Sequence, residues 1–325
     1  MKTRFLLTTI ASAALFLTAC NTDENPGEDW DGRIHLSSSV ATLTRTSHEL
    51  DDKIANNEKV WLYVEGNETE ASTQYYGKEL TATGNNTFAG ADELFFPANE
   101  TSINLYAFHI NEAGEAQMKT NAYPTVPLTH KVDQNQQSTS GTSGYAKSDL
   151  LYAKTSLSRE DAKTNVGAVA LPFKHLLSKI EVVLLEGAGK DEMDIQNVEI
   201  LNTKLQGTFT PSKTAAFSVS ASGDVDGSTH NPIQIDKEVT TDESAPVLNE
   251  AIIIPQEVAN ETPFIRVTLS TKGELIYKLD KTTTFAPGTK YRYTITAKLT
   301  GLTVTSSIDP WIGGGTPNTG NAEMQ

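Results

Sequence analysis

Hydrophobic and polar residues alternate along several short segments of the chain, which is typical of β-strands with one face in a core and one in water. The clearest alternation covers residues 265–269 and 291–299. A turn sequence, Ala-Pro-Gly-Thr at 286–289, predicts a hairpin between a strand at 275–279 and the strand at 291–299. Further strands are predicted at 60–64, 103–110, 150–153, 198–201, 217–219 and 251–254. Short strands separated by Gly, Asn and Pro clusters predict an all-β protein built from β-sandwiches.

The segment around residue 180 carries two competing patterns. Its apolar residues fall at helical spacing, which by itself allows an amphipathic helix: Phe173, Leu176, Leu177, Ile180, Val183 and Leu184. The β-branched pair Val182-Val183 and the following Glu186-Gly187 favour a buried strand instead. We therefore expect a strand over residues 180–185.

The chain length of 325 residues suggests two domains. Residues 133–148 are polar and low in complexity, and they predict a long mobile loop inserted in the first domain. A second polar stretch, residues 156–165, places the domain boundary near residue 166. The predicted units are an N-terminal β-sandwich domain over 34–166, a C-terminal β-sandwich domain over 167–312, and a flexible tail over 313–325.

The first nineteen residues have the pattern of a secretory signal peptide, with charged residues at its start and an apolar run over 5–17. The run ends in Leu17-Thr18-Ala19-Cys20, which resembles a bacterial lipobox, so we expect cleavage between Ala19 and Cys20 and lipidation of the Cys20 thiol. Cys20 is the only cysteine, which excludes an internal disulfide. Lipidation would anchor the exported chain to a membrane. Residues 20–33 form an acidic tether.

The charge balance excludes one class of partner. The chain has 26 Lys and Arg residues against 41 Asp and Glu residues, which gives a formal net charge of −15. An acidic surface repels phosphates, and no basic stripe is visible in the sequence, so we expect no nucleic-acid partner.

No sequence motif indicates catalysis or metal binding. The six histidines are scattered, without a pair at the spacing that puts two ligands on one helical face. The Asp224–Ser228 segment begins like a calcium loop but has Ile235 where the loop needs a glutamate. We expect His175, in an apolar segment, to have a structural role. The sequence thus predicts no enzyme, no metal site and no cofactor. Tyr75-Tyr76 and Phe95-Phe96 are candidate aromatic platforms for a glycan, although aromatic pairs more often pack in a core.

Several segments, taken in order, resemble the fimbrillin family, the subunits of type V pili in gut and oral anaerobes. The segments are the lipobox Leu17–Cys20, Thr-Arg-Thr-Ser at 44–47, Leu-Pro-Phe-Lys-His-Leu-Leu-Ser-Lys-Ile at 171–180, Ala-Ile-Ile-Ile-Pro-Gln at 251–256, Pro-Gly-Thr-Lys-Tyr-Arg-Tyr at 287–293 and Ile-Asp-Pro-Trp at 308–311. The resemblance implies two transthyretin-like β-sandwich domains in tandem.

The resemblance also implies a mechanism of assembly. A lipoprotein precursor reaches the outer membrane and the cell surface, an Arg-specific protease removes its first strand, and a strand from another fimbrillin subunit fills the exposed groove. Because this contact is head-to-tail, it builds a filament that serves cell adhesion. In this sequence the removable strand would carry Ile34, Leu36 and Val40, and the cut would separate Arg45 from Thr46. Arg33 is the rival cleavage residue, but a cut there would leave the strand in place.

The candidate donor strand lies near the C-terminus and alternates through Leu302, Val304 and Ile308. If this segment already belongs to the second sandwich, little remains to donate, so a stalk, tip or anchor position stays open. The alternative from another class is a glycan-binding outer-membrane lipoprotein of a polysaccharide-uptake system.

Overall fold

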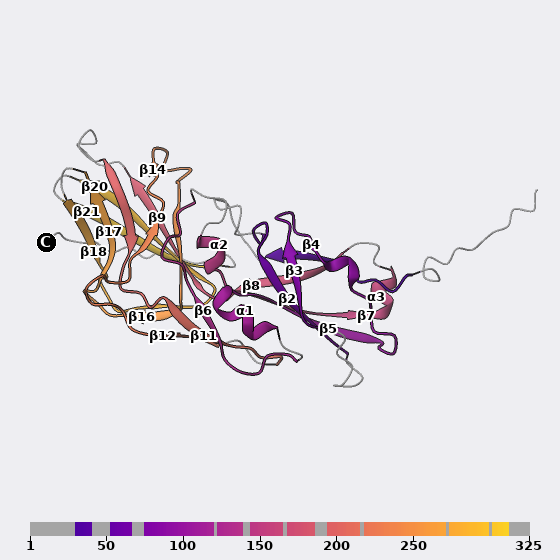
Figure 1. Ribbon diagram of the computed structural model, residues 1–325. Coiled ribbons are helices and arrows are strands. Elements are labelled where there is room, and N and C mark those ends of the chain that lie inside the picture. The colour runs from indigo at the N-terminus through magenta and orange to yellow at the C-terminus, as the bar shows by residue number, and fades with distance from the viewer. Residues whose placement is uncertain are drawn as a thin grey trace, which may run out of the picture.

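The computed structural model describes residues 30–40, 53–66, 75–119, 122–138, 144–164, 168–185, 194–214, 218–270, 273–298 and 301–311 (Figure 1). Strands dominate these residues, so the predicted all-β class is confirmed. The described helices are short: η1 (Ala91–Glu93), α1 (Glu112–Met118), α2 (Gly144–Ser148) and α3 (Arg159–Thr164). No helix in the described part of the chain is long and apolar enough to cross a membrane.

One seven-stranded sheet organises the N-terminal half. Its order is β1 (Leu36–Val40), β8 (Val169–His175), β7 (Leu151–Ser158), β5 (Ser102–His109), β2 (Lys59–Gly66), β3 (Tyr75–Ala82) and β4 (Phe88–Ala89). Residues 60–64 of β2 are a continuous apolar run because both faces of this strand are buried: Val60, Leu62 and Val64 pack on one side, and Trp61 and Tyr63 on the other.

Four smaller sheets form the C-terminal half. The largest contains β14 (Val239–Thr240), β9 (Ser178–Leu185), β20 (Thr289–Lys298) and β21 (Gly301–Pro310), and β15 (Asn249–Ile253) also pairs with β9. The second contains β13 (Ile233–Ile235), β10 (Ile195–Ile200), β17 (Pro263–Leu269) and β18 (Gly273–Lys278). The remaining sheets are β12 (Ser218–Ser222), β11 (Gln206–Thr210) and β6 (Leu128–Lys131), and β16 (Gln256–Val258) with β19 (Thr283–Phe285).

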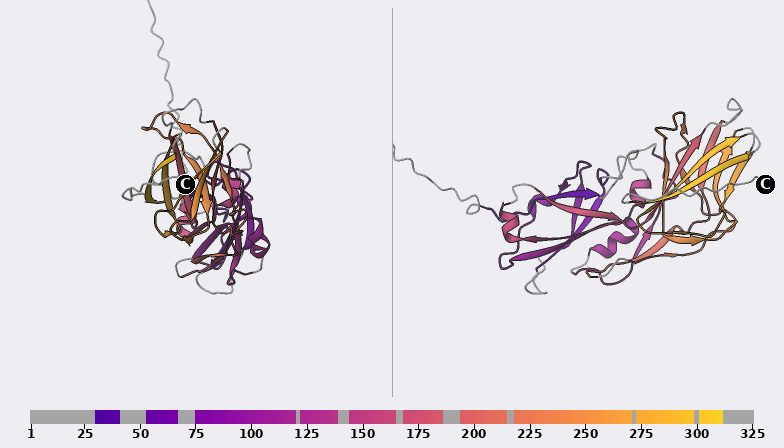
Figure 2. Two further views of the ribbon diagram at one scale, coloured as in Figure 1. Left: turned by 90° about the vertical axis from the view of Figure 1, so that its left-hand side faces the viewer. Right: turned by 180° about the vertical axis from the view of Figure 1, so that it is seen from behind.

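The two halves lie end to end (Figure 2) and share an apolar core at their junction. Aromatic side chains from the first sheet meet the C-terminal half there, with the rings of Phe108 and Phe209 5.9 Å apart. A second core, which lies within the N-terminal half, contains Leu36, Leu105 and Phe173. The seven-stranded sheet therefore packs on both faces.

The chain crosses between the halves more than once. β8 follows the boundary predicted at residue 166, yet it pairs with β1 and β7 in the first sheet. β6 precedes that boundary, yet it pairs with β11 in the C-terminal half. The passage into the second half after β8 comes at Leu176-Leu177, just before β9. Pairing partners far apart in the sequence, rather than polar composition, decide where each half begins.

Residues 133–148 differ from the predicted mobile loop at the positions that the structure describes. Gln136 is 2% exposed, and its side-chain amide donates to the Ile252 carbonyl (2.9 Å) and accepts from the Ile252 N–H (2.7 Å). Residues 144–148 form helix α2. A single glutamine that satisfies both polar groups of a buried strand residue can hold a segment of otherwise loop-like composition.

The strand predicted over 180–185 is confirmed as part of β9, which runs parallel to β20 in register from Ser178 opposite Thr289. Every residue of β9 but the last is buried. Because both faces of β9 are covered, apolar residues occur at many spacings, including helical ones. The turn predicted at 286–289 is also present, and Gly288 adopts a φ of 60° there.

Candidate functional site

β1 fills a groove between two edges of the N-terminal half. On one side it pairs in parallel with β8, from Leu36 opposite Val169 to Val40 opposite Phe173. On the other side it forms antiparallel bridges with the 86–96 segment, at Ser37 with Thr87 and at Arg33 with Phe95. β1 thereby connects the two ends of the sheet: its neighbour in the strand order is β8, and the 86–96 segment contains β4, the strand at the opposite end.

Backbone hydrogen bonds attach the β1 segment along this second edge. The Ile34 N–H donates to the Leu94 carbonyl (2.8 Å), and the Ser38 N–H donates to the Asn86 carbonyl (2.9 Å). The Phe96 N–H donates to the Gly32 carbonyl (2.7 Å). A strand bonded on both edges has its main-chain polar groups satisfied as in the interior of a sheet.

The inward side chains of this segment belong to the core. The exposed fractions of Ile34, Leu36 and Val40 are 1%, 4% and 7%, and all three pack in the core of the N-terminal half. His35 and Ser39 face outward and are exposed. This alternation makes β1 an integral strand of the sheet rather than a surface appendage.

An aromatic cluster holds the start of the segment. The Trp30 indole donates to the Arg33 carbonyl (3.1 Å), and its ring packs edge-on against Phe96 with centroids 5.9 Å apart. The Arg159 guanidinium lies over the Phe96 ring at 4.8 Å and donates to the Ala98 and Glu100 carbonyls. The main chain at Arg33 is thus fixed on both sides.

Four predicted site residues lie outside the described part of the chain: Ala19, Cys20, Arg45 and Thr46. Lipidation, signal cleavage and proteolytic cleavage at these positions therefore stay predictions. The described chain ends at Val40 on one side of the Arg45 segment and resumes at Lys53 on the other.

The candidate donor residues lie in β21, which pairs antiparallel with β20 over its whole length. Leu302 and Val304 are 7% and 1% exposed, and Ile308 packs partly buried against the same core. The opposite edge of β21 has no strand partner among the described residues. In this conformation the segment completes the chain's own C-terminal sheet.

Trp311 anchors the end of β21 at the junction of the halves. Its backbone N–H donates to the Gly288 carbonyl (2.7 Å), and its indole ring stacks on the His175 ring with centroids 3.7 Å apart. The Lys179 ammonium lies 5.9 Å from the Trp311 ring. Lys179 is fully buried and pairs with Glu250 at 2.6 Å. The sequence signal for this buried ion pair was a lysine within an otherwise apolar strand. The partner, Glu250, can be identified only from the fold.

Three histidines scattered in the sequence meet around Asp149. The His175 Nδ1 lies 2.9 Å from the Asp149 carboxylate, which matches the structural role expected for this histidine. The His109 Nδ1 lies 2.8 Å from the Asp149 carbonyl, and the His130 Nε2 lies 2.8 Å from the Ser148 carbonyl. Each is a non-local contact, so sequence spacing could not reveal the cluster.

Burial and charge act in opposite directions on this cluster. Burial lowers the pKa of His130 to about 4, although its backbone hydrogen bond to Ser148 works in the opposite direction. Burial also acts to lower the pKa of His109, but the hydrogen bond and charge of Glu58 outweigh it and raise this pKa. Burial acts to raise the pKa of Asp149, but the charge and hydrogen bond of His175 leave it below its ordinary value.

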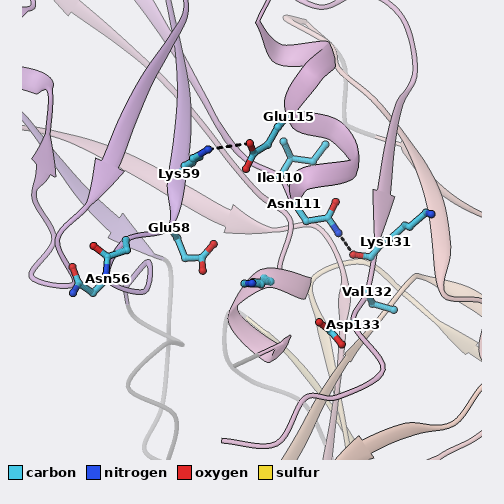
Figure 3. A pocket seen from close by; sticks show the side chains of 11 residues that line it. Asn56, Glu58, Lys59, Ile110, Asn111, Glu115, Lys131, Val132 and Asp133 are labelled. Carbon is cyan, nitrogen blue, oxygen red and sulfur yellow. Dashed lines mark hydrogen bonds and ion pairs between the residues drawn. The ribbon is translucent and has the colours of Figure 1, made fainter. Parts of the chain in front are cut away.

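A polar pocket of about 450 Å³ opens beside the histidine cluster (Figure 3). It lies between the start of β2, the β5–α1 connection, the end of β6 and helix α2. Its lining includes Glu58, Lys59, Asn111, Asp133 and Lys147. The part of the chain described here contains no group of three or more His, Cys, Asp or Glu side chains that could hold a metal ion.

The aromatic pairs suggested as glycan platforms serve other contacts. Phe96 is 5% exposed, and the Tyr75 hydroxyl donates to the Glu93 carbonyl (3.2 Å) and accepts from the Phe95 N–H (2.8 Å). Phe95 is 40% exposed and lies under the Arg33 guanidinium. These rings hold the 86–96 segment beside β1.

Comparison with known proteins identifies the family. The model of a family described as fimbrillin-like matches residues 44–311. The chain belongs to the fimbrillin-like family. A relative titled "Putative fimbrium subunit Fim1C", from Bacteroides uniformis, is 23% identical to this fimbrillin-like chain over 99% of the chain and 100% of the relative.

Two solved structures share the fimbrillin-like chain's fold. A Bacteroides ovatus protein has a TM-score of 0.62 at 16% identity, and a Bacteroides uniformis protein has a TM-score of 0.58 at 18% identity. Each match covers 87% of this chain and 99% of the other, and each structure is titled a "putative cell adhesion protein".

Proposed function

We propose that this fimbrillin-like chain is a fimbrial subunit of the cell surface that assembles by donor-strand exchange and serves adhesion, without an enzymatic role. One observation carries the proposal: β1 occupies a groove, bonded at both edges, with Ile34, Leu36 and Val40 buried in the core. Membership of the family and the name of the Fim1C relative support the same function.

The proposed first step is proteolysis. An Arg-specific protease hydrolyses the Arg45–Thr46 peptide bond, consuming one water and leaving a carboxylate on Arg45 and an amine on Thr46. The released piece contains β1. Arg45 suits this role better than Arg33, because a cut after Arg33, whose main chain is paired with Phe95, would leave β1 in place.

Loss of β1 would leave two unpaired edges, one on β8 and one on the 86–96 segment, above an apolar floor. Unpaired main-chain groups and exposed apolar surface are both costly in water. An incoming strand lowers the free energy most when it runs parallel to β8, as β1 does, and places apolar side chains at every second position.

The source of that strand is another fimbrillin subunit. Residues Leu302, Val304 and Ile308 of one subunit could be donated to the next only after β21 detaches from β20 along the length that they pair. Otherwise the donor comes from a different subunit type, and this chain would accept a strand without giving one.

The proposed location follows from the N-terminal segment. Signal cleavage between Ala19 and Cys20 and lipidation of Cys20 would hold the precursor at the outer membrane. Of the predicted tether 20–33, only the residues ahead of Trp30 could serve as one, because residues 30–33 pack against the 86–96 segment. A cut after Arg45 would then free the subunit from its lipid, so that one bond cleavage both releases the subunit and opens the groove.

Limited proteolysis of residues 21–325, the chain without its predicted leader, tests the proposal. Brief treatment with an Arg-specific protease, which does not cut after Lys53, followed by intact mass and size-exclusion chromatography, should remove the residues up to Arg45 and yield oligomers or a strand-accepting monomer. An Arg45→Ala variant should keep β1 and stay monomeric, and an Arg33→Ala variant should behave as the unmodified chain. A folded body that retains β1 after this treatment, or cleavage that the Arg45→Ala variant does not affect, would contradict the proposal.

A further inference from the structure

The polar pocket is neutral in a strongly acidic protein. Three lysines, Lys59, Lys131 and Lys147, line it together with three carboxylates, Glu58, Glu115 and Asp133. The whole chain, by contrast, has a formal charge of −15. A pocket with balanced charge does not select for an ionic ligand, because an added charge of either sign meets as much repulsion as attraction.

Neighbouring groups fix several of these side chains in place. Lys59 and Glu115 pair at 3.2 Å across the pocket wall, and Glu58 lies 3.2 Å from the buried His109. The Asn111 amide donates to the Lys131 carbonyl. Side chains that are already positioned lose little conformational entropy when a ligand binds.

The pocket keeps free hydrogen-bonding capacity. The buried Asn111 Oδ1 has no hydrogen-bond partner. Burial acts to raise the pKa of Glu58, but the hydrogen bond and charge of His109, with a smaller contribution from the charge of Lys147, leave this pKa below its ordinary value. Amide side chains of Asn56 and Asn57 add further donors and acceptors. Figure 3 shows Glu58, Asn111 and Asp133 arranged around one hollow from three different segments.

We propose that this pocket binds a short neutral saccharide. Each sugar hydroxyl both donates and accepts a hydrogen bond, which matches a wall of mixed amides, carboxylates and ammonium groups. Ile110 and Val132 offer the apolar contact that the C–H face of a sugar ring needs. The volume of about 450 Å³ lies within the range of small-molecule sites.

This proposal is independent of strand exchange. No residue that lines the pocket lies in β1, β8 or the 86–96 segment. The two proposals therefore fail separately: loss of sugar binding would leave proteolysis and assembly unchanged, and loss of strand exchange would leave the pocket intact.

Saturation-transfer NMR and calorimetry on residues 21–325 test the proposal with defined probes. The neutral panel is maltose, lactose, cellobiose, mannobiose and chitobiose, and the charged probes are digalacturonic acid and sialyllactose. We expect at least one neutral disaccharide to bind with a Kd tighter than about 10 mM, and the double variant Asn56→Ala/Lys147→Ala to weaken it about tenfold or more.

The matched control is Asn260→Ala/Lys281→Ala, which removes an exposed amide and an exposed ammonium from the C-terminal half, outside the pocket lining, and should leave the Kd unchanged. Thermal melting of all variants verifies that they fold. Three results would overturn the proposal: no neutral sugar bound, charged sugars bound in preference to neutral ones, or equal binding by the pocket variant and the control.

Discussion

The strands near the two ends of the described chain, β1 and β21, differ in how they are held. β1 is short but bonded at both edges, to β8 and to the 86–96 segment. β21 is twice as long, with 10 residues against 5, yet it pairs only with β20. Length alone therefore does not decide how tightly a strand belongs to its sheet.

This difference in pairing decides which of the two strands suits strand exchange. A strand bonded on both edges leaves a complete groove when it is removed, whereas removal of an outer strand merely turns its neighbour into the new edge. β1 thus suits the role of a replaceable strand. β21 suits the role of a strand that could pair with a partner through its outer edge or leave as a unit.

Removing β1 should have the largest effect on stability. A chain that begins at Thr46 loses the burial of Ile34, Leu36 and Val40, each worth about 1.5–3 kcal/mol. We expect the N-terminal half to lose roughly 5 kcal/mol or more, which is comparable to the whole stability of many domains. A synthetic peptide of residues 30–41 should raise the melting temperature of the truncated chain, with an increase that grows with the logarithm of the peptide concentration.

A peptide with Leu36→Asp serves as the control and should restore nothing. The contrast between the two end strands would be lost if the truncated chain melted like the full one, or if both peptides acted equally.

Replacing Trp311 with alanine should have the next largest effect, and it should loosen β21 and the junction around His175 rather than β1. Trp311 is 2% exposed and stacked on His175, so its loss should cost about 3–5 kcal/mol. Hydrogen exchange should become faster at the β21 amides while the β1 amides keep their protection. Trp30→Ala, which removes a partly exposed indole from the start of the β1 segment, should produce the opposite pattern with a smaller loss.

Acid should destabilise the histidine cluster around Asp149, on which Trp311 stacks through His175, before it loosens β1, which packs in the other core. The pKa of His130 falls to about 4 on folding, so the unfolded chain binds its proton first, and stability falls as the pH drops from about 6.5 to 4. The loss from His130 alone should reach about 3 kcal/mol.

Urea unfolding between pH 8 and pH 4 measures this effect. His130→Gln should keep a donor toward Ser148 and make the acid slope shallower, while the lowered pKa of Asp149 still contributes to the slope that remains. The raised pKa of His109 changes stability with pH in the opposite direction. Its contribution to stability is complete below the ordinary histidine pKa and is lost as the pH rises through the raised value. An identical acid slope in His130→Gln and the unmodified chain would refute the assignment.

Ser38→Ala should have the smallest effect. The Ser38 hydroxyl makes one long contact, 3.5 Å, with the Asn86 side chain, whereas its backbone N–H bond to Asn86 survives the substitution. We expect a loss below about 1 kcal/mol by urea unfolding. A loss as large as that of Trp311→Ala would mean that side-chain contacts, not the two bonded edges, hold β1 in place.

The sequence predicted the strands better than their partners. The alternation of apolar and polar residues predicted β17 and β20, and the turn residues at 286–289 predicted the connection between β18 and β20. Both patterns depend only on residues that are close in the sequence. The parallel pairing of β1 with β8 joins residues more than 120 positions apart, so local pattern carries no trace of it. The same reason explains the boundary near 166, which composition placed before β8 although β8 completes the N-terminal sheet.

The candidate site was predictable in the same uneven way. A strand with Ile34, Leu36 and Val40 was expected from the family resemblance, but the second edge that encloses these residues was not. The histidines around Asp149 and the pocket beside them arise from segments brought together only by the fold. Gln136 shows the converse, since its polar segment gave no sign that its side chain would be buried.

The parallel pairing of β1 with β8 also has a mechanical consequence. Tension on the chain ahead of Trp30 pulls β1 along its own axis, so the bonds from Leu36 to Val40 and those to the 86–96 segment share the load in shear. Bonds loaded together resist far more force than bonds opened one after another. An uncut precursor tethered by its N-terminus would therefore bear drag from flow through this short strand, and cleavage beyond it would disconnect that load at once.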